Sequence, residues 1–239
     1  MKLDILVIGA HPDDVELSCG GTVAKLTRQG KKVGIIDLTE GEMGTRGSPE
    51  IRAREANEAA KILGVAARDN LRIPDGHIDN SPENRAKLIR QLREYRPEVI
   101  IFPYSIDRHP DHEQAHVLCK QAWFYSGLEK LETLHNGQKQ SPFRPRAWLN
   151  FMQWYEFTPS FIVDVTEEYA VRMKAVRAFK SQFYDPHSQE RDTLLSRPDF
   201  LDMVETRLEY YGDRIGTKYG EPFFLRTPVG IRSLDDLIL

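Results

Sequence analysis

The first half of the chain alternates short apolar segments with longer segments of helical character. Runs rich in Ile, Leu and Val predict strands over residues 3–9, 31–39, 70–76 and 98–104. Helices are predicted over residues 15–29, 49–63, 82–95 and 113–125. Strands separated by helices of this length imply βαβ units with right-handed crossovers. The alternation therefore predicts an α/β fold with a Rossmann-like, mostly parallel sheet flanked by helices.

Residue types that start and stop helices support two of these boundaries. Ser48 followed by Pro49, and Ser81 followed by Pro82, are typical of an N-cap and the first helical residue. Gly64 has the residue type that commonly follows the end of a helix. Both helices are therefore predicted from their ends as well as from their apolar positions.

The pattern is less regular past Ser126. Residues 134–146 are polar and carry two prolines, which favours a long loop, and such loops tend to be functional. Strands are predicted over residues 147–157, 161–165 and 221–228, and helices over residues 166–183 and 199–211. Because the chain has 239 residues and no long linker, we expect one domain over residues 1–239.

Charge and cysteine content restrict the partners and the compartment. The 33 Lys and Arg residues against 36 Asp and Glu give a formal net charge of −3 without a basic run, which argues against a nucleic-acid partner. No segment approaches the roughly 20 apolar residues that span a bilayer. Cys19 and Cys119 lie in predicted helices among small or apolar neighbours, as reduced thiols do. These features predict a cytoplasmic protein that binds neither nucleic acid nor a membrane.

Two His-Pro-Asp segments follow two of the predicted strands. The first is GAHPDDVEL, residues 9–17, and the second lies within IIFPYSIDRHPDHEQA, residues 100–115. In a doubly wound sheet with strand order 3-2-1-4-5, the first and fourth strands are neighbours, and ligands bind beyond their carboxyl ends. The two segments are therefore predicted to face each other across one crevice.

The residue types in these segments favour a cation over a phosphate. Gly9 does not begin the glycine-rich turn of a dinucleotide site, and two adjacent carboxylates would repel a phosphate. His11, Asp14 and His112 offer two imidazoles and one carboxylate, a set found around catalytic zinc. Alternatively, the aspartates could merely cap the following helix, and each histidine could be structural. Both segments together, after neighbouring strands, favour a metal site.

The other histidines carry weaker signals. His116 lies four residues after His112 and is interpreted as a packing residue. His77, His135 and His187 lie in predicted loops, where the sequence indicates no partner. None of the four is included in the predicted site.

The quoted motifs resemble those of the LmbE-like, or PIG-L, family of zinc-dependent N-acetylglucosamine deacetylases. The resemblance rests on AHPDDVEL and DRHPDH and covers essentially the whole chain. The flanking segments DLTEGEMGTRGSPEIRAREANEAAKILG, LRIPDG and SQFYDPH are similar to the bacillithiol-biosynthesis branch, the N-acetylglucosaminyl-malate deacetylases. The resemblance implies a hydrolase that removes an N-acetyl group from a small amino-sugar conjugate, N-acetylglucosaminyl-malate in this branch.

The resemblance also implies roles for individual residues. It implies zinc, or another divalent cation such as Fe²⁺, as cofactor. The implied metal ligands are His11, Asp14 and His112. The implied general base is Asp13, and His109, oriented by Asp111, is implied to stabilise the oxyanion. A protonated His109 would then meet the negative oxygen of the tetrahedral intermediate. Asp13, left free of the metal, would accept the proton of the attacking water and pass it to the leaving amine.

Other implied features lie outside the two motifs. Arg52 matches the sugar-binding arginine of the family, and Arg144 is the candidate for an arginine at the rim of the site. Phe200 stands where a relative has a mobile tyrosine. The glycine-rich residues 41–48 are predicted to form a loop that closes over the sugar. Relatives of this kind are often hexameric, which implies a homo-oligomer.

Three alternatives remain open from the sequence. Two histidines and one carboxylate also form the facial triad of non-haem Fe(II) oxygenases. A metal-stabilised regulatory domain would carry the same ligands without turnover. Within the family, an amidase acting on a glucosamine–thiol conjugate differs only in the acyl group that leaves, whereas a lipid-linked substrate fits poorly with a chain that has no predicted anchor.

Overall fold

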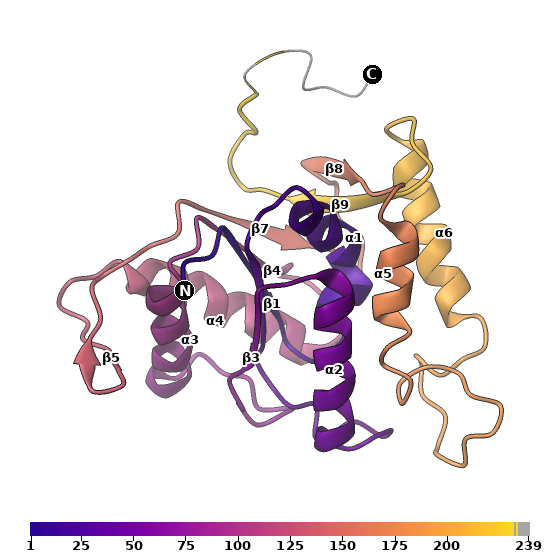
Figure 1. Cartoon of the computed structure of the whole chain (residues 1–239), viewed down its shortest axis with the longest axis horizontal. Helices are drawn as coiled ribbons and strands as arrows, with labels where there is room; N and C mark the ends of the chain where they lie inside the picture. Colours follow the sequence, from indigo (N-terminus) through magenta and orange to yellow (C-terminus); the bar gives the residue numbers. More distant parts are fainter. Residues whose placement is uncertain (232, 234–239) are drawn as a thin grey trace.

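A seven-stranded sheet forms the centre of the fold (Figure 1). This computed structural model describes residues 1–231 and 233. The strands of the sheet are β1 (Ile5–Gly9), β2 (Val33–Asp37), β3 (Ala67–Asn70), β4 (Val99–Pro103), β7 (Ala147–Phe151), β8 (Phe161–Asp164) and β9 (Gly220–Phe224). Their order is β3-β2-β1-β4-β7-β9-β8. The first five strands in this order are parallel, and β9 pairs antiparallel with β7 and β8. The predicted 3-2-1-4-5 order is confirmed, with β7 as the fifth strand.

Helices cover both faces of the sheet, as predicted. They are α1 (Asp14–Arg28), α2 (Pro49–Leu63), α3 (Pro82–Tyr95), α4 (Pro110–Ser126), α5 (Tyr169–Val176) and α6 (Phe200–Asp213). Figure 1 shows α3 and α4 on one side and α1, α2, α5 and α6 on the other. Leu6 and Ile8 of β1 belong to the core under α3 and α4, whereas Val7 belongs to the core under α1 and α2. Alternate side chains of one strand therefore fill both layers, which explains its continuous apolar sequence.

The helix ends predicted from serine, proline and glycine are confirmed. The Oγ atom of Ser48 accepts a hydrogen bond from the amide of Ile51 at 3.3 Å, at the start of α2. The Oγ atom of Ser81 accepts one from the amide of Asn84 at 3.2 Å, at the start of α3. Gly64 ends α2 at φ +70°, a conformation that glycine adopts without a Cβ penalty.

The third strand lies earlier than predicted. Strand β3 covers Ala67–Asn70, not residues 70–76, and it is a polar edge strand that pairs with β2. The apolar signal came from Leu71 and Ile73, which are buried in the loop that follows. Arg72 between them has φ 50°, which turns the chain out of the strand. This loop then carries Asp75 to the carboxyl end of the sheet.

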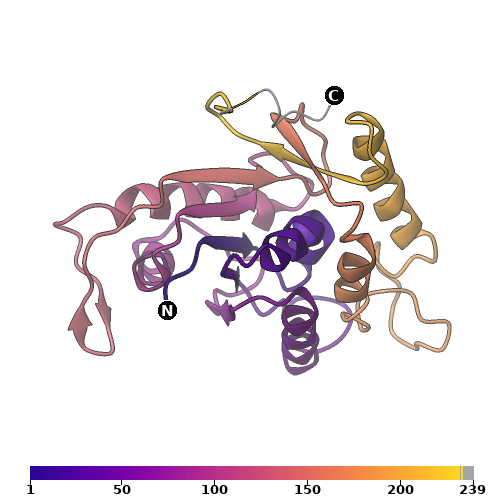
Figure 2. The same ribbon diagram turned by 45° about the horizontal axis from the view of Figure 1, so that its top comes forward.

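The second half also differs from the prediction in detail. The predicted loop contains a ribbon, β5 (Leu134–His135) paired with β6 (Gln138–Lys139), which projects from the body of the molecule (Figure 2). The predicted strand over residues 147–157 ends at Phe151, and the predicted helix over residues 166–183 is regular only over α5. Within residues 1–231 and 233, no helix is both long enough and apolar enough to cross a bilayer.

Helix α1 is interrupted at Cys19, whose φ of −147° and ψ of 25° are not helical. A side chain from β9 supplies the acceptor that the restarting helix needs. The Glu221 carboxylate accepts hydrogen bonds from the amides of Gly21 at 2.8 Å and Thr22 at 2.6 Å. It also forms an ion pair with Arg172 of α5 at 3.0 Å, and both charged side chains are buried. This pair joins α1, α5 and β9 about two helical turns past Asp14, the first residue of α1.

Candidate active site

Three neighbouring parallel strands end at one cavity of about 540 Å³. The loop after β1 brings His11, the first turn of α4, which follows β4, brings His112, and the loop after β7 brings Gln153 to its wall. Strands β1 and β4 pair directly, with Ile5 opposite Val99. The predicted meeting of the two His-Pro-Asp segments beyond adjacent strands is therefore confirmed.

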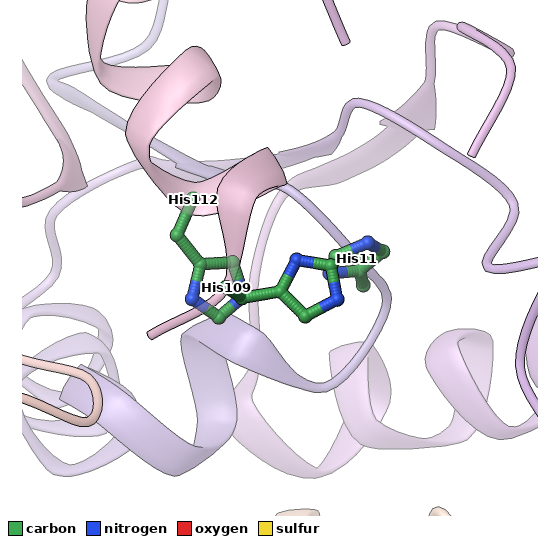
Figure 3. A group of neighbouring side chains, drawn as sticks. All are labelled: His11, His109 and His112. Carbon is green, nitrogen blue, oxygen red and sulfur yellow. The ribbon is translucent and has the colours of Figure 1, made fainter. Parts of the chain in front are cut away.

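Three imidazole rings lie side by side (Figure 3), and all three line this cavity. The ring centroids of His11 and His109 are 4.8 Å apart, and those of His109 and His112 are 4.9 Å apart in a stacked pair. The His11 and His112 centroids are 5.5 Å apart. Each ring offers a nitrogen within 4.8 Å of the other two. One cation can therefore reach at least two of these rings.

Asp14 lies between His11 and His112. Its Oδ2 atom is 3.6 Å from Nδ1 of His11, and its Oδ1 atom is 3.3 Å from Nε2 of His112. The backbone amide of His11 donates to Oδ2 of Asp14 at 2.8 Å, which fixes the carboxylate. Two ring nitrogens and a carboxylate thus converge from the two predicted segments.

Two further aspartates hold the outer nitrogens of these rings. Oδ1 of Asp75 is 2.9 Å from Nε2 of His11, and Oδ1 of Asp107 is 2.8 Å from Nδ1 of His112. Because a carboxylate accepts the outer N–H, the inner nitrogen of each ring is the one that can offer a lone pair to a metal ion once it carries no proton. Such carboxylate–histidine pairs commonly orient metal ligands. Neither aspartate is predicted from the sequence as a site residue, although LRIPDG and DRHPDH contain them.

The electrostatics of this cluster favour a positive charge at the inner nitrogens. Burial alone would lower the pKa of His112, but the charge of Asp14 and the hydrogen bond of Asp107 outweigh it and raise the pKa to about 9. A divalent cation would supply this positive charge. The nitrogen and oxygen atoms of these side chains are ligand types that suit zinc or Fe²⁺. His11, Asp14 and His112 therefore fit the metal that the sequence predicts.

Asp13 lines the same cavity, where its carboxylate pairs with Arg52. Its Oδ2 atom accepts a hydrogen bond from Nη2 of Arg52 at 3.0 Å, and both side chains are buried. Its φ is 110°, which is unusual for a residue other than glycine and typical of strained functional positions. Asp13 makes no side-chain cap to α1, so the capping alternative fails for it. Burial raises its pKa to about 7 although Arg52 opposes the rise.

His109 is the N-cap of α4, and its surroundings differ from the prediction. Its Nδ1 atom accepts a hydrogen bond from the backbone amide of Asp111 at 3.2 Å, which leaves the proton on Nε2. The Asp111 carboxylate instead lies 3.4 Å from Nε2 of His11 and accepts from the amide of Gly76 at 2.8 Å. Burial and the charges of His11 and His112 lower the pKa of His109. His109 is therefore a neutral donor oriented by a backbone amide, not an imidazolium held by the Asp111 carboxylate.

The two predicted arginines lie in different places. Arg52 lines the cavity. Arg144 is exposed, and its Nη2 atom donates to the carbonyl of Phe124 at 2.6 Å near the far end of α4. Phe124 is about 18 Å beyond His112 along this helix. Arg144 therefore does not join the other predicted residues in this chain, because it lies outside the two motifs that carry the resemblance.

The upper wall of the cavity is mostly apolar. Phe200 begins α6 and lines the cavity, so the position offers a ring without a hydroxyl. The other apolar residues of this wall are Leu17, Trp154, Leu194, Leu195, Met203 and Val204. Met43 of the glycine-rich loop also lines the cavity, and its amide donates to Oδ2 of Asp75 at 3.0 Å. The closure of that loop over a sugar stays a prediction.

His116 is a packing residue, as interpreted from the sequence. It is buried beside Phe102, with ring centroids 5.4 Å apart. Its Nδ1 atom is 3.0 Å from the carbonyl oxygen of Pro103. These contacts hold α4 against β4 and keep His112, one turn earlier, at the cavity.

Comparisons with known proteins relate this chain to a family of enzymes. The model of the PIG-L family, GlcNAc-PI de-N-acetylase, matches residues 6–123, which include both His-Pro-Asp segments. The diacetylchitobiose deacetylase of Thermococcus kodakarensis is 29% identical over 231 residues, covering 91% of this chain and 80% of that protein.

Two solved structures share the fold. The conserved protein TT1542 from Thermus thermophilus has a TM-score of 0.85 and 38% identity over 96% of this chain and 97% of that one. The N,N'-diacetylchitobiose deacetylase from Pyrococcus horikoshii, solved with its inhibitor MPG, has a TM-score of 0.77 and 26% identity over 98% of this chain and 88% of that one. The chain therefore belongs to the PIG-L, or GlcNAc-PI de-N-acetylase, family.

Proposed function

We propose that this protein hydrolyses the N-acetyl group of an N-acetylglucosamine conjugate with a divalent cation held by His11, Asp14 and His112. The observation that carries the proposal is the convergence of these three side chains in one cavity with Asp13, whose carboxylate pairs with Arg52. Deacetylases among the similar proteins support the reaction class. The flanking sequence segments support N-acetylglucosaminyl-malate of bacillithiol biosynthesis as substrate.

The cation would activate the carbonyl group and the water, and side chains of the protein would transfer the protons. When bound, a zinc ion polarises an amide carbonyl and lowers the pKa of a water to about 7. Asp13 is the cavity carboxylate that is not assigned to the cation, and it accepts the proton of the attacking water, then delivers it to the leaving amine. Its ion pair with Arg52 at 3.0 Å keeps the carboxylate in place.

His109 supplies the donor for the developing oxyanion. Its Nδ1 atom is occupied by the amide of Asp111, so its Nε2–H is the group free to donate to the negative oxygen of the tetrahedral intermediate. Asp111 acts through His11, whose Nε2 atom lies 3.4 Å from it. Arg52 lines the cavity and has a guanidinium group wide enough to contact both Asp13 and a sugar hydroxyl.

The decisive experiment is acetate release from N-acetylglucosaminyl-malate, with diacetylchitobiose and an acyl glucosamine–thiol conjugate as competing substrates. We expect acetate from the malate conjugate with the highest kcat/KM of the three. Higher kcat/KM on diacetylchitobiose would keep the reaction and reject the substrate. No acetate from any acetylated sugar, by protein with a full equivalent of zinc, would reject the deacetylase proposal.

Removal of the cation is expected to abolish acetate release without unfolding the chain. Both core layers and the Glu221–Arg172 pair stand apart from the three ligands, so the sheet does not depend on the ion. Dialysis against a chelator followed by circular dichroism and an activity assay checks this. Restoration of activity by about one equivalent of Zn²⁺ is expected, and full activity in the chelated protein would contradict the cation's role.

Asp107→Asn is expected to weaken Zn²⁺ binding by roughly 10- to 100-fold. The asparagine removes the charge that favours the N–H on the outer nitrogen of His112 and therefore makes the inner nitrogen a poorer ligand. Competition with a chromophoric chelator measures the dissociation constant. Asp199→Asn is the matched control, because Asp199 pairs with Arg197 on the surface. Equal affinities in both variants would contradict the positioning role of Asp107.

A further inference from the structure

The side chain of Gln153, just past the end of β7, touches two of the three proposed metal ligands. Its Nε2 atom lies 2.9 Å from Oδ1 of Asp14 and 3.2 Å from Nε2 of His112. Its Oε1 atom is buried, and among residues 1–231 and 233 no donor reaches it. A buried amide oxygen without a partner is costly, so its position calls for an explanation.

The three contacting atoms form a triangle with the dimensions of a coordination sphere. Oδ1 of Asp14 and Nε2 of His112 are 3.3 Å apart, and the Gln153 amide closes the other two sides at 2.9 and 3.2 Å. Ligand atoms around a tetrahedral zinc are about 3.3 Å apart, because each lies about 2.0–2.1 Å from the ion. The end of the Gln153 side chain therefore lies at the position of a neighbouring ligand.

The amide nitrogen and oxygen can exchange places without moving the backbone. An –NH₂ group only donates, so it satisfies the lone pairs of Asp14 and His112 that a cation would otherwise use. A half-turn about the last side-chain bond brings Oε1 to the same point, where it offers a lone pair. This rotation would let the unpartnered Oε1 atom bind the cation. It would also remove the N–H group that competes with the cation for Asp14 and His112.

The backbone of Gln153 is anchored to the same carboxylate that orients His112. Oδ1 of Asp107 lies against Nδ1 of His112, and Oδ2 accepts a hydrogen bond from the amide of Trp154 at 2.7 Å. Arg207 of α6 donates to the carbonyl of Gln153. One aspartate thus contacts both His112 and the peptide group that links Gln153 to Trp154.

We infer that Gln153 is a further protein ligand of the cation, through Oε1. The inference rests on the proposed cation site and adds a third strand end, that of β7, to its ligands. The amide is neutral, so the charge of a dication with one carboxylate and two imidazoles stays at +1. The ion therefore gains a fixed ligand and keeps the charge that makes it a Lewis acid.

The experiment compares Gln153→Leu with Gln182→Leu. Gln182 lines the same cavity, but its amide donates to the carbonyl of Arg46 and to Ser181, not to the metal-site residues. Zn²⁺ dissociation constants come from chelator competition, and the visible absorption of Co²⁺-loaded protein reports the ligand set. Gln153→Leu is expected to raise the dissociation constant about tenfold or more, since even outer partners of ligands contribute about 10- to 100-fold. Its Co²⁺ spectrum should change, whereas Gln182→Leu should keep the wild-type spectrum and affinity.

The outcomes separate this inference from the proposed function. If wild-type protein binds no cation, the proposed function fails and the inference fails with it. If wild type and Gln153→Leu bind Zn²⁺ equally and give the same Co²⁺ spectrum, only the inference is overturned. Tighter binding by Gln153→Leu would show that the amide merely competes with the ion, which also overturns it. If Gln153→Leu does not fold, the isosteric variant Gln153→Glu is tested in its place. Its carboxylate would be an anionic ligand, so this variant should bind the ion more tightly than the wild-type protein does.

Discussion

Asp13→Asn is expected to lower kcat/KM for acetate release by roughly 10²- to 10⁴-fold, the usual contribution of a general base. The amide of asparagine has nearly the shape of the carboxylate but cannot accept the proton of the attacking water. Asparagine also tolerates positive φ better than alanine does, which matters because Asp13 has φ 110°. Steady-state acetate assays on protein of equal zinc content measure the loss.

Two controls make this result specific to Asp13. Metal content should stay at one equivalent, because the Asp13 carboxylate contacts Arg52 and not the three ligands. Asp14→Asn, the same change one residue later, should lose zinc affinity, because Asp14 lies between His11 and His112. Activity within about threefold of wild type in Asp13→Asn would move the general base to another residue.

Glu221→Ala is expected to lower the free energy of unfolding by roughly 3–5 kcal/mol, the usual result of breaking a buried ion pair from one side. The alanine leaves the Arg172 guanidinium buried without its carboxylate. It also removes the acceptor for the amides of Gly21 and Thr22, where α1 restarts after Cys19. Urea denaturation followed by circular dichroism measures the difference.

A surface pair and a double variant serve as controls for Glu221. Glu167→Ala breaks the ion pair with Arg28, whose members are 71% and 56% exposed, and exposed pairs contribute only about 0–1 kcal/mol. The double variant Glu221→Leu with Arg172→Met should recover part of the loss, because no unpaired charge stays buried. A loss below about 1 kcal/mol in Glu221→Ala would mean that water or rearrangement satisfies Arg172.

The sequence predicted the strand order and the meeting of the two motifs because both follow from local signals and one topological rule. Apolar runs, the N-cap serines and the glycine that ends α2 are local signals, and the doubly wound strand order places β1 beside β4. The predicted position of the third strand was wrong because Leu71 and Ile73 are buried in a loop. Their apolar side chains give the same sequence pattern as a buried strand. Propensity alone cannot separate the two cases.

The supporting residues of the site could not be predicted in the same way. Asp75, Asp107 and Gln153 are single polar residues in loops, and their contacts arise only when three strand ends come together. Nothing in their sequence spacing reports these contacts. The role of Asp111 was misassigned for a related reason, since its proximity to His109 in sequence says nothing of where its carboxylate points.

The gathering of ligands from the ends of β1 and β4 has a thermodynamic consequence. An unfolded chain holds His11 and His112 far apart, so it offers no preformed site for an ion. A ligand that binds only the native state adds a free energy that grows with its concentration, about 2.7 kcal/mol at a hundred times its dissociation constant. Under the proposed function, the melting temperature of this protein therefore depends on the zinc concentration of its surroundings.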